Sequence, residues 1–585
     1  MGILDLLFLS NILFLLCGSL HASNTYSVGD HVPLFVNKVG PLHNPSETYR
    51  YYELPFCHPG QMLEKKENLG EVLNGDRLEN ALYELEYLVN KSQIVLCHQK
   101  LDRENVAKFR DAIVTDSYYQ MYYDDLPLWA FIGKIENESW TPDSKGPKHF
   151  LFTHVQFNAL YNGKHVIEIH ALGDPNHVVD VSEDVDITVE FTYSVFWNEI
   201  STPYKNRMDR YTGTALLPVF QQIHLFTYVN SFGMVILLMG MLTMLYKRHL
   251  KYDLRKGSIG DEEEDKAVGW KQIHGDVFRC PTNLPLLSAL VGSGTQLLFM
   301  VFILSLLSFL GILYPYNRGA LSGLIFFCYI LTSAFAGYNS ASLCNQYPEA
   351  GQERSVLLAG IIFFVPVLFT TIPLNILAAY FGVTAALPLG TMIVIFLIFT
   401  LVAVPLLILG GVVGKRCKTE IQSSSITKKI PREIPPLVWY RKTPAQMFIA
   451  GLLPFGAIIL EFHLLCSTIW GHKVYTVPSI LFVTFIILAV LTALLGVCFT
   501  YFQLAVEDHE WCWQSVLRGG STAFFMFAYC IYFYFKSNMS GILQTAFFFG
   551  YSALMCYAFF LMLGTLSFRA SSLFVRRIYR AVKRE

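Results

Sequence analysis

Nine long apolar segments occupy the chain from about residue 222 onwards, and they limit its fold more than any other feature. Each is long enough to cross the hydrocarbon core of a bilayer, which takes about 20 residues of helix. Backbone polar groups in lipid must be paired within the protein, so such segments are expected to be α-helices. We expect nine transmembrane helices near residues 222–246, 290–314, 319–341, 355–380, 384–414, 444–470, 474–503, 519–536 and 542–568, which form a domain of residues 222–568.

Composition agrees with a multi-pass membrane protein that contacts the lipid bilayer along most of its length. Of the 585 residues, 53% are hydrophobic and only 15% are charged, which is far from the balance of a soluble domain. The formal net charge of −1 provides no basic excess to neutralise phosphates. We therefore expect no binding to nucleic acid.

The first 22 residues are typical of a secretory signal peptide. An apolar run of about fifteen residues is followed by small residues, and Ala22 is a plausible last residue before cleavage. The alternative is an uncleaved anchor helix.

Residues 23–221 form a polar, aromatic-rich stretch that predicts a luminal β-rich, sandwich-like domain. Residues 165–172 and 184–197 alternate apolar and polar side chains and are rich in β-branched and aromatic residues, the pattern of strands with one buried face. Residues 71–90 are more helical in pattern. About two hundred residues suffice for one domain with its own core.

The predicted luminal domain contains two cysteines, Cys57 and Cys97. In an oxidising compartment an isolated pair is expected to form a disulfide, the alternative being two buried thiols. The tripeptides that begin at Asn90 and Asn137 fit the N-glycosylation pattern. Both asparagines are therefore candidate glycosylation sites.

The distribution of Lys and Arg predicts the orientation of the chain. If residues 23–221 are luminal, twenty-four of these residues lie in the connections and tail on the cytosolic side. The luminal connections hold only Arg318 and Lys473, with Lys536 at an edge. This bias follows the positive-inside rule, so the C-terminal residues 569–585 are expected to be a cytosolic tail.

Two ionisable residues, Glu461 and His463, lie within the predicted sixth span. Such residues at membrane depth often mark a functional site, and proline and glycine interrupt several spans, as in many transporters. A proton or ion relay is one interpretation. The other is a structural glutamate that is neutral or hydrogen-bonded between helices.

The predicted loop after the seventh span holds Asp508, Glu510, Trp511 and Trp513. Two acids and two indoles form a candidate surface for a partner or a lipid headgroup, although tryptophan is also common at membrane interfaces. We find no nucleophile elbow, phosphate-binding loop, dinucleotide fingerprint or zinc-protease motif. The sequence therefore predicts no enzyme, no metal site and no cofactor.

Three stretches resemble the nonaspanins, the transmembrane nine superfamily: VPLFVNKVGPLHNPSETYRYYELPFC at 32–57, YFQLAVEDHEWCWQSVLRGGSTAFFMFAY at 501–529, and the FVRRIY and KRE segments of the tail. The resemblance covers the whole chain. It departs at 511–514, where family members usually carry consecutive tryptophans and an arginine but this chain has Trp511, Cys512, Trp513 and Gln514.

The resemblance implies a multi-pass protein of the Golgi and endosome membranes that helps sort other membrane proteins, particularly clients with glycine-rich spans. It implies that COPI coat subunits bind Lys583, Arg584 and Glu585 as a Golgi retention signal. Capture of a C-terminal carboxylate beside a cation is a known recognition mode, but these cations also suit an ordinary basic flank.

The resemblance further implies an export signal for the coat that loads vesicles at the endoplasmic reticulum. Its residues would be Phe574, Val575, Arg576, Arg577, Ile578 and Tyr579. Phe574 and Ile578, four residues apart, could instead belong to the end of the ninth helix. Two rival functions stay open: a transporter or channel that uses the interrupted helices and Glu461, and a luminal module that binds a lipid or glycan.

Overall fold

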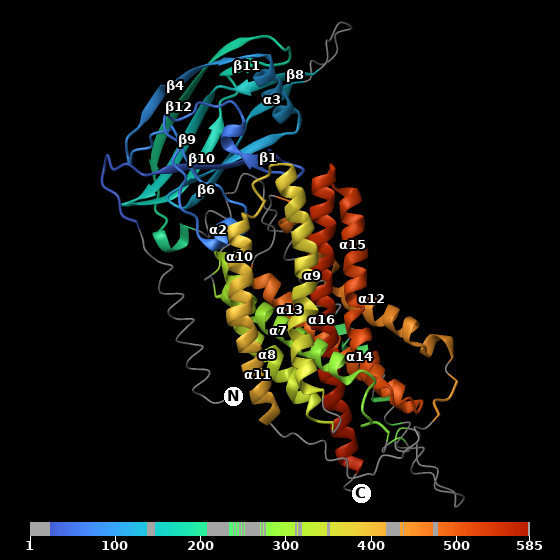
Figure 1. Ribbon diagram of the computed structural model, residues 1–585. Coiled ribbons are helices and arrows are strands. Elements are labelled where there is room, and N and C mark those ends of the chain that lie inside the picture. The colour runs from blue at the N-terminus through green and yellow to red at the C-terminus, as the bar shows by residue number, and fades with distance from the viewer. Residues whose placement is uncertain are drawn as a thin grey trace, which may run out of the picture.

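The structure, a computed structural model, has a β-rich domain at one end of a helical bundle (Figure 1). It describes residues 24–136, 147–207 and 276–582, apart from gaps at 311–312, 314–318, 348–350, 417–432, 437 and 472–477, and scattered residues between 233 and 273. Several predicted features lie outside these residues: the signal peptide 1–22, Asn137, most of the first predicted span, and Lys583, Arg584 and Glu585.

Three sheets build the β-rich domain. All described strand pairs are antiparallel except that between β12 and β9, which is parallel. The first sheet has the strand order β2 (Tyr49–Arg50), β1 (Leu34–Pro41), β5 (Ser117–Tyr123) and β6 (Leu126–Phe131), with β3 (Glu79–Asn80) also paired to β1. The second has the order β10 (His165–Gly173), β9 (His154–Asn162), β12 (Ile187–Glu199) and β4 (Lys91–Leu101). The third has the order β11 (Val178–Asp180), β8 (Lys148–Phe152) and β7 (Gly133–Glu136).

The alternating segments are strands, as predicted. Residues 165–172 lie in β10, and 184–197 overlap β12, in which Val189, Phe191 and Tyr193 face the domain core. The helical prediction for 71–90 is wrong beyond its first residues. Helix α2 (Leu69–Leu73) stops because Gly75 follows in a left-handed conformation, with φ of 70°.

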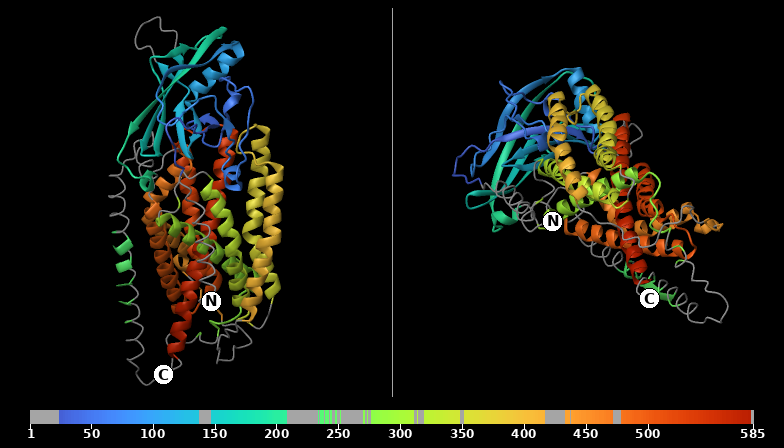
Figure 2. Two further views of the ribbon diagram at one scale, coloured as in Figure 1. Left: turned by 90° about the vertical axis from the view of Figure 1, so that its left-hand side faces the viewer. Right: turned by 60° about the horizontal axis from the view of Figure 1, so that its bottom comes forward.

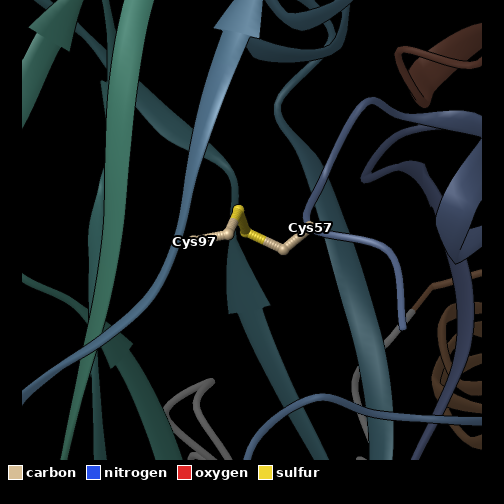
Figure 3. Close-up of a disulfide and its surroundings, with 2 residues drawn as sticks. All are labelled: Cys57 and Cys97. Atoms are coloured by element: carbon tan, nitrogen blue, oxygen red, sulfur yellow. A yellow bond between two sulfur atoms is a disulfide. The ribbon is translucent and has the colours of Figure 1, made fainter. Parts of the chain in front are cut away.

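The disulfide ties β4 to the segment that follows β2 (Figure 3). Cys57 and Cys97 have Cα atoms 6.1 Å apart and are 40 residues apart in sequence. Asn90, the glycosylation candidate in the described part, lies just before β4 on the domain surface. Its Oδ1 accepts a hydrogen bond of 2.8 Å from the backbone N–H of Trp197.

The described residues contain eight helical segments that are long and apolar enough to cross a membrane. They correspond to the second to ninth predicted spans, so the predicted multi-pass fold is confirmed. The helices are α7 (Leu284–Phe309), α8 (Ala320–Cys344), α9 (Gln352–Tyr380), α10 (Leu389–Ile398) continued through a π-helical turn (Phe399–Ala403) into α11 (Val404–Arg416), α12 (Thr443–Ile469), α13 (Pro478–Ala505), α14 (Trp511–Gly520) followed directly by α15 (Thr522–Lys536), and α16 (Ile542–Val582).

Helices α9 to α11 stand at one side of the bundle (Figure 2). Only 11% of the most apolar 18 residues of each of these spans is buried. Phe369 of α9 is 80% exposed, and Leu389 of α10 is 77% exposed. Large apolar side chains on the outside of such a bundle are suited to contact lipid. This side of the bundle is therefore its most extensive lipid-facing surface among the described helices.

The β-rich domain is docked on the near end of the bundle through polar contacts. The Thr48 and Thr384 hydroxyls lie 2.6 Å apart, Arg77 Nη2 donates to the Ala386 carbonyl at 2.9 Å, and the Ser540 N–H donates to Asn44 Oδ1 at 3.1 Å. These bonds link the domain to the connections that follow α9 and α15. The two parts therefore form one connected structure.

Candidate functional site

Most of the candidate residues from the sequence gather at the end of the bundle farthest from the β-rich domain (Figure 1). There the start of α14, the last turns of α16 and the residues just before α7 form one apolar cluster, which we call the distal cluster. Its buried members are Ile273, Val277, Leu287, Val291, Leu343, Leu504, Trp511, Cys512, Val516, Phe568, Val575 and Tyr579.

The export hexapeptide, Phe574–Tyr579, is the end of helix α16 and part of the distal cluster. The helix continues past residue 568, the predicted end of the ninth span, to Val582. Val575 is fully buried, and Tyr579 is 2% exposed with its hydroxyl donating to the Trp270 carbonyl at 2.7 Å. Burial of this face, including Phe568, explains why the helix persists.

The opposite face of this helix end is open. Leu573 is 70% exposed and Arg577, four residues later, is also exposed, while Phe574 and Ile578 are half-buried. Arg576 is engaged with the bundle, because its Nη2 donates to Gln346 Oε1 in the turn that follows α8. A partner that binds the packed helix would therefore contact Leu573 and Arg577 first.

The two tryptophans hold the start of α14 against the segment before α7. Trp511 is 4% exposed, its Nε1 donates to the Val277 carbonyl at 3.0 Å, and its ring stacks on Phe568. Trp513 Nε1 donates to the Thr282 carbonyl at 2.7 Å. The interpretation of Trp511 as a residue that grips an external partner is therefore wrong, because its indole is used inside the protein.

The two acids of the predicted loop have different surroundings. Asp508 is 3% exposed, and its carboxylate accepts hydrogen bonds from the Glu510 N–H at 3.0 Å and from Gln514 Nε2 at 3.2 Å. Glu510 is exposed. Of the four interfacial candidates, Glu510 is thus the acid available at the surface, while Asp508 belongs to an internal polar network.

The residue at the centre of that network, Arg518, is not among the predicted site residues. It follows the seventh predicted span, lies in α14 and is 1% exposed. Its Nη2 donates to Gln503 on α13 and to Gln514 one turn earlier on α14. The spacing of Gln514 and Arg518, i and i+4, is the signal in the sequence that could have placed both on one helix face.

The intramembrane candidates both lie on α12. Glu461 is 3% exposed, and His463 Nδ1 lies 2.8 Å from the Tyr529 hydroxyl of α15. This histidine contact joins two neighbouring helices. Among the described residues, no group of three or more His, Cys, Asp or Glu side chains is arranged to hold a metal ion.

A pair of histidines in the β-rich domain predicts a pH dependence of stability. The rings of His154 and His177 are 5.2 Å apart, and both ring nitrogens of buried His154 contact hydroxyls, those of Thr192 at 2.8 Å and Ser194 at 3.0 Å. Burial, and secondly the charge of His177, lowers the pKa of His154.

The unfolded chain therefore binds a proton at His154 at higher pH than the folded domain does. The free energy of unfolding should fall as the pH drops below about 6.5, the ordinary pKa of histidine. His154→Gln should flatten this part of the pH profile, measured by thermal unfolding of the purified protein. His43→Gln, at an exposed position, should leave the profile as it is, and equal profiles for wild type and His154→Gln would contradict the assignment.

Comparisons with known proteins agree with this architecture. Residues 48–542 match the family model "Endomembrane protein 70". The chain is 52% identical over 565 residues to Transmembrane 9 superfamily member 5 of Arabidopsis thaliana, covering 96% of each chain. It is 38% identical over 574 residues to Transmembrane 9 superfamily member 1 of Bos taurus, covering 95% of this chain and 94% of that protein. The chain thus belongs to the endomembrane protein 70 family, the transmembrane 9 superfamily.

Proposed function

We propose that this protein helps other membrane proteins to sort and reach their destination in the Golgi and endosomes, and that coats cycle it by binding its C-terminal segment. The observation that carries the proposal is the match to an endomembrane family over nearly the whole chain. The multi-pass architecture supports it, because a bundle with a large lipid-facing side offers transmembrane helices of client proteins a surface to contact.

Helix α16 provides the physical link between coat and client. It runs as one helix from the end of the bundle near the β-rich domain through the distal cluster to Val582, and Lys583, Arg584 and Glu585 follow directly (Figure 1). It packs against α7, α9, α13, α14 and α15. A coat subunit bound beyond Val582 would therefore hold the whole bundle, together with any client in contact with it.

Export from the endoplasmic reticulum would use the same helix end. In the packed state the export coat has access to Leu573 and Arg577, while Val575 and Tyr579 face the distal cluster. We infer that the coat reads the exposed face of the helix. The cytosolic placement of this end rests on the bias of Lys and Arg in the connections.

Replacing Lys583 and Glu585 together by serine in the full chain should move the protein from the Golgi to later compartments. The substitution removes the cation and the side-chain carboxylate of the retention signal and leaves α16 as it is. Fluorescence microscopy of a form tagged after residue 23 measures the steady-state distribution. Arg354→Ser, at an exposed position outside the C-terminal segment, is the control for loss of one cation, and it should keep the Golgi distribution.

An unchanged distribution of the Lys583→Ser, Glu585→Ser variant would contradict retention by this signal. A transporter or channel is the second candidate, favoured by the burial of Glu461 within α12. It requires Glu461→Gln to abolish an ion or solute flux in proteoliposomes while client delivery in cells is preserved. If the Glu461→Gln variant keeps both activities, Glu461 is needed for neither transport nor client delivery.

A further inference from the structure

The buried arginine of α14 lies in the interior of the bundle. Helix α14 contacts α12, α13, α15 and α16. The span formed by α14 and α15 is the most buried of the described spans, with 56% of its most apolar 18 residues inside the protein. Arg518 follows Trp511 by two turns and is 1% exposed. Its guanidinium is therefore removed from both water and lipid.

The protein pairs only the Nη2 group of this guanidinium. Nη2 donates to Gln503 Oε1 and Gln514 Oε1. In the part of the chain that the structure describes, Nε and Nη1 have no hydrogen-bond partner. A buried positive charge without a partner is strongly unfavourable, so these two groups point to an acceptor that is not part of the described protein.

Gln503 adds a second unpaired donor at the same place. Because a guanidinium only donates, the Gln503 side chain must turn its oxygen to Arg518. Its Nε2 then has no partner among the described residues, although the side chain is 4% exposed. Two side chains from different helices thus present unpaired N–H groups within one buried contact.

The nearest carboxylate does not neutralise Arg518 directly. Gln514 lies between the two charges, because its Oε1 accepts from Arg518 while its Nε2 donates to Asp508 at 3.2 Å. None of the ion pairs recorded for the described residues includes Arg518. Asp508 therefore reaches the guanidinium only through a neutral amide, and its hydrogen bonds to Glu510 and Gln514 hold it there.

We propose that Arg518 and Gln503 form a binding site for a small inorganic anion between α13 and α14. The anion accepts one hydrogen bond from an unpaired N–H group of Arg518 and one from Nε2 of Gln503, and it supplies the missing negative charge. Helices surround α14, so a free ion such as chloride fits this position better than the headgroup of a phospholipid, which carries two acyl chains. This inference is independent of the sorting function.

The test uses the purified full chain in detergent, in sodium gluconate, with sodium chloride added at constant ionic strength. A ligand that binds the folded state raises Tm, and the rise depends on its concentration relative to Kd. We expect the Tm of the wild-type protein to rise with chloride concentration, and the concentration at which the rise begins gives the Kd for chloride. Arg518→Gln should lose this rise. Arg569→Gln should keep it, because Arg569 is also bonded to an amide oxygen, Asn339 Oδ1, but lies on α16.

Gln503→Met provides a second variant in case Arg518→Gln does not fold. It removes one donor and keeps the guanidinium, so the chloride concentration needed for the same rise in Tm should increase about tenfold, the effect of one hydrogen bond to a charged group. A wild-type Tm that does not respond to chloride would overturn the proposal, as would equal responses in wild type and both variants. Stabilisation by phosphatidic acid added to the detergent micelles, without a response to chloride, would also overturn it, in favour of a lipid headgroup.

Discussion

Replacing Cys57 and Cys97 together by serine is expected to lower the free energy of unfolding of the β-rich domain by about 4 kcal/mol. The disulfide closes a loop of 40 residues, and in the chain-entropy account its contribution grows with the logarithm of loop length. The loop includes α2, which contacts α8 of the bundle. Loss of the bond should therefore also loosen the docking of the domain on the bundle.

Pulse proteolysis of the full chain in increasing urea measures this effect on the β-rich domain. The double variant should be cleaved at a lower urea concentration than the wild-type protein. Wild-type protein treated with a reducing agent should behave like the double variant, while Cys498→Ser, at a free cysteine in α13, should behave like untreated wild type. Equal urea midpoints for the double variant and the wild type would show that the disulfide contributes little.

Replacing Gly337 by leucine is expected to destabilise the bundle by about 3 kcal/mol or more. Gly337 of α8 faces α11, and a Cβ atom there would overlap the Leu407 carbonyl oxygen. Gly410 and Gly414 of α11 are in similarly close contact with the α8 backbone at Ala334 and Tyr338. Small residues let these two helices approach closely, so a large side chain must force them apart.

Thermal unfolding of the purified protein in detergent measures the loss of stability. Gly456→Leu is the matched control, because Gly456 lies in the interior of α12 and a Cβ atom there meets no atom within 4 Å. The control should unfold within a few degrees of wild type. If Gly337→Leu unfolds at the temperature of the control, the packing of α8 on α11 is looser than the structure indicates.

The membrane part of the fold could be predicted because a bilayer imposes a simple rule on length and hydropathy. That rule placed α8 to α13 within five residues of their observed bounds and α7 within six. It failed at α14, where the run after Trp511 carries Gln514 and Arg518 and does not appear apolar. Arg518 is bonded to Gln503 on another helix as well as to Gln514, and hydropathy cannot show such a contact.

The candidate site was predicted less well, because its contacts join distant parts of the chain. Residues after 568 appeared to be a tail, since they are basic and polar. Their apolar members Val575 and Tyr579 pack on the segment before α7, and the bond from Tyr579 to Trp270 spans 309 residues. A local pattern gives the face of a helix but not the partner that covers it, so burial of the hexapeptide could not be foreseen.

Depletion with rescue tests whether the protein delivers other membrane proteins. The measurement is the surface arrival, by biotinylation, of client proteins with glycine-rich transmembrane helices in cells that lack this protein. We predict that depletion retains these clients inside the cell, that the full chain restores delivery, and that the Lys583→Ser, Glu585→Ser variant does not. Normal arrival of the clients in depleted cells would contradict the account.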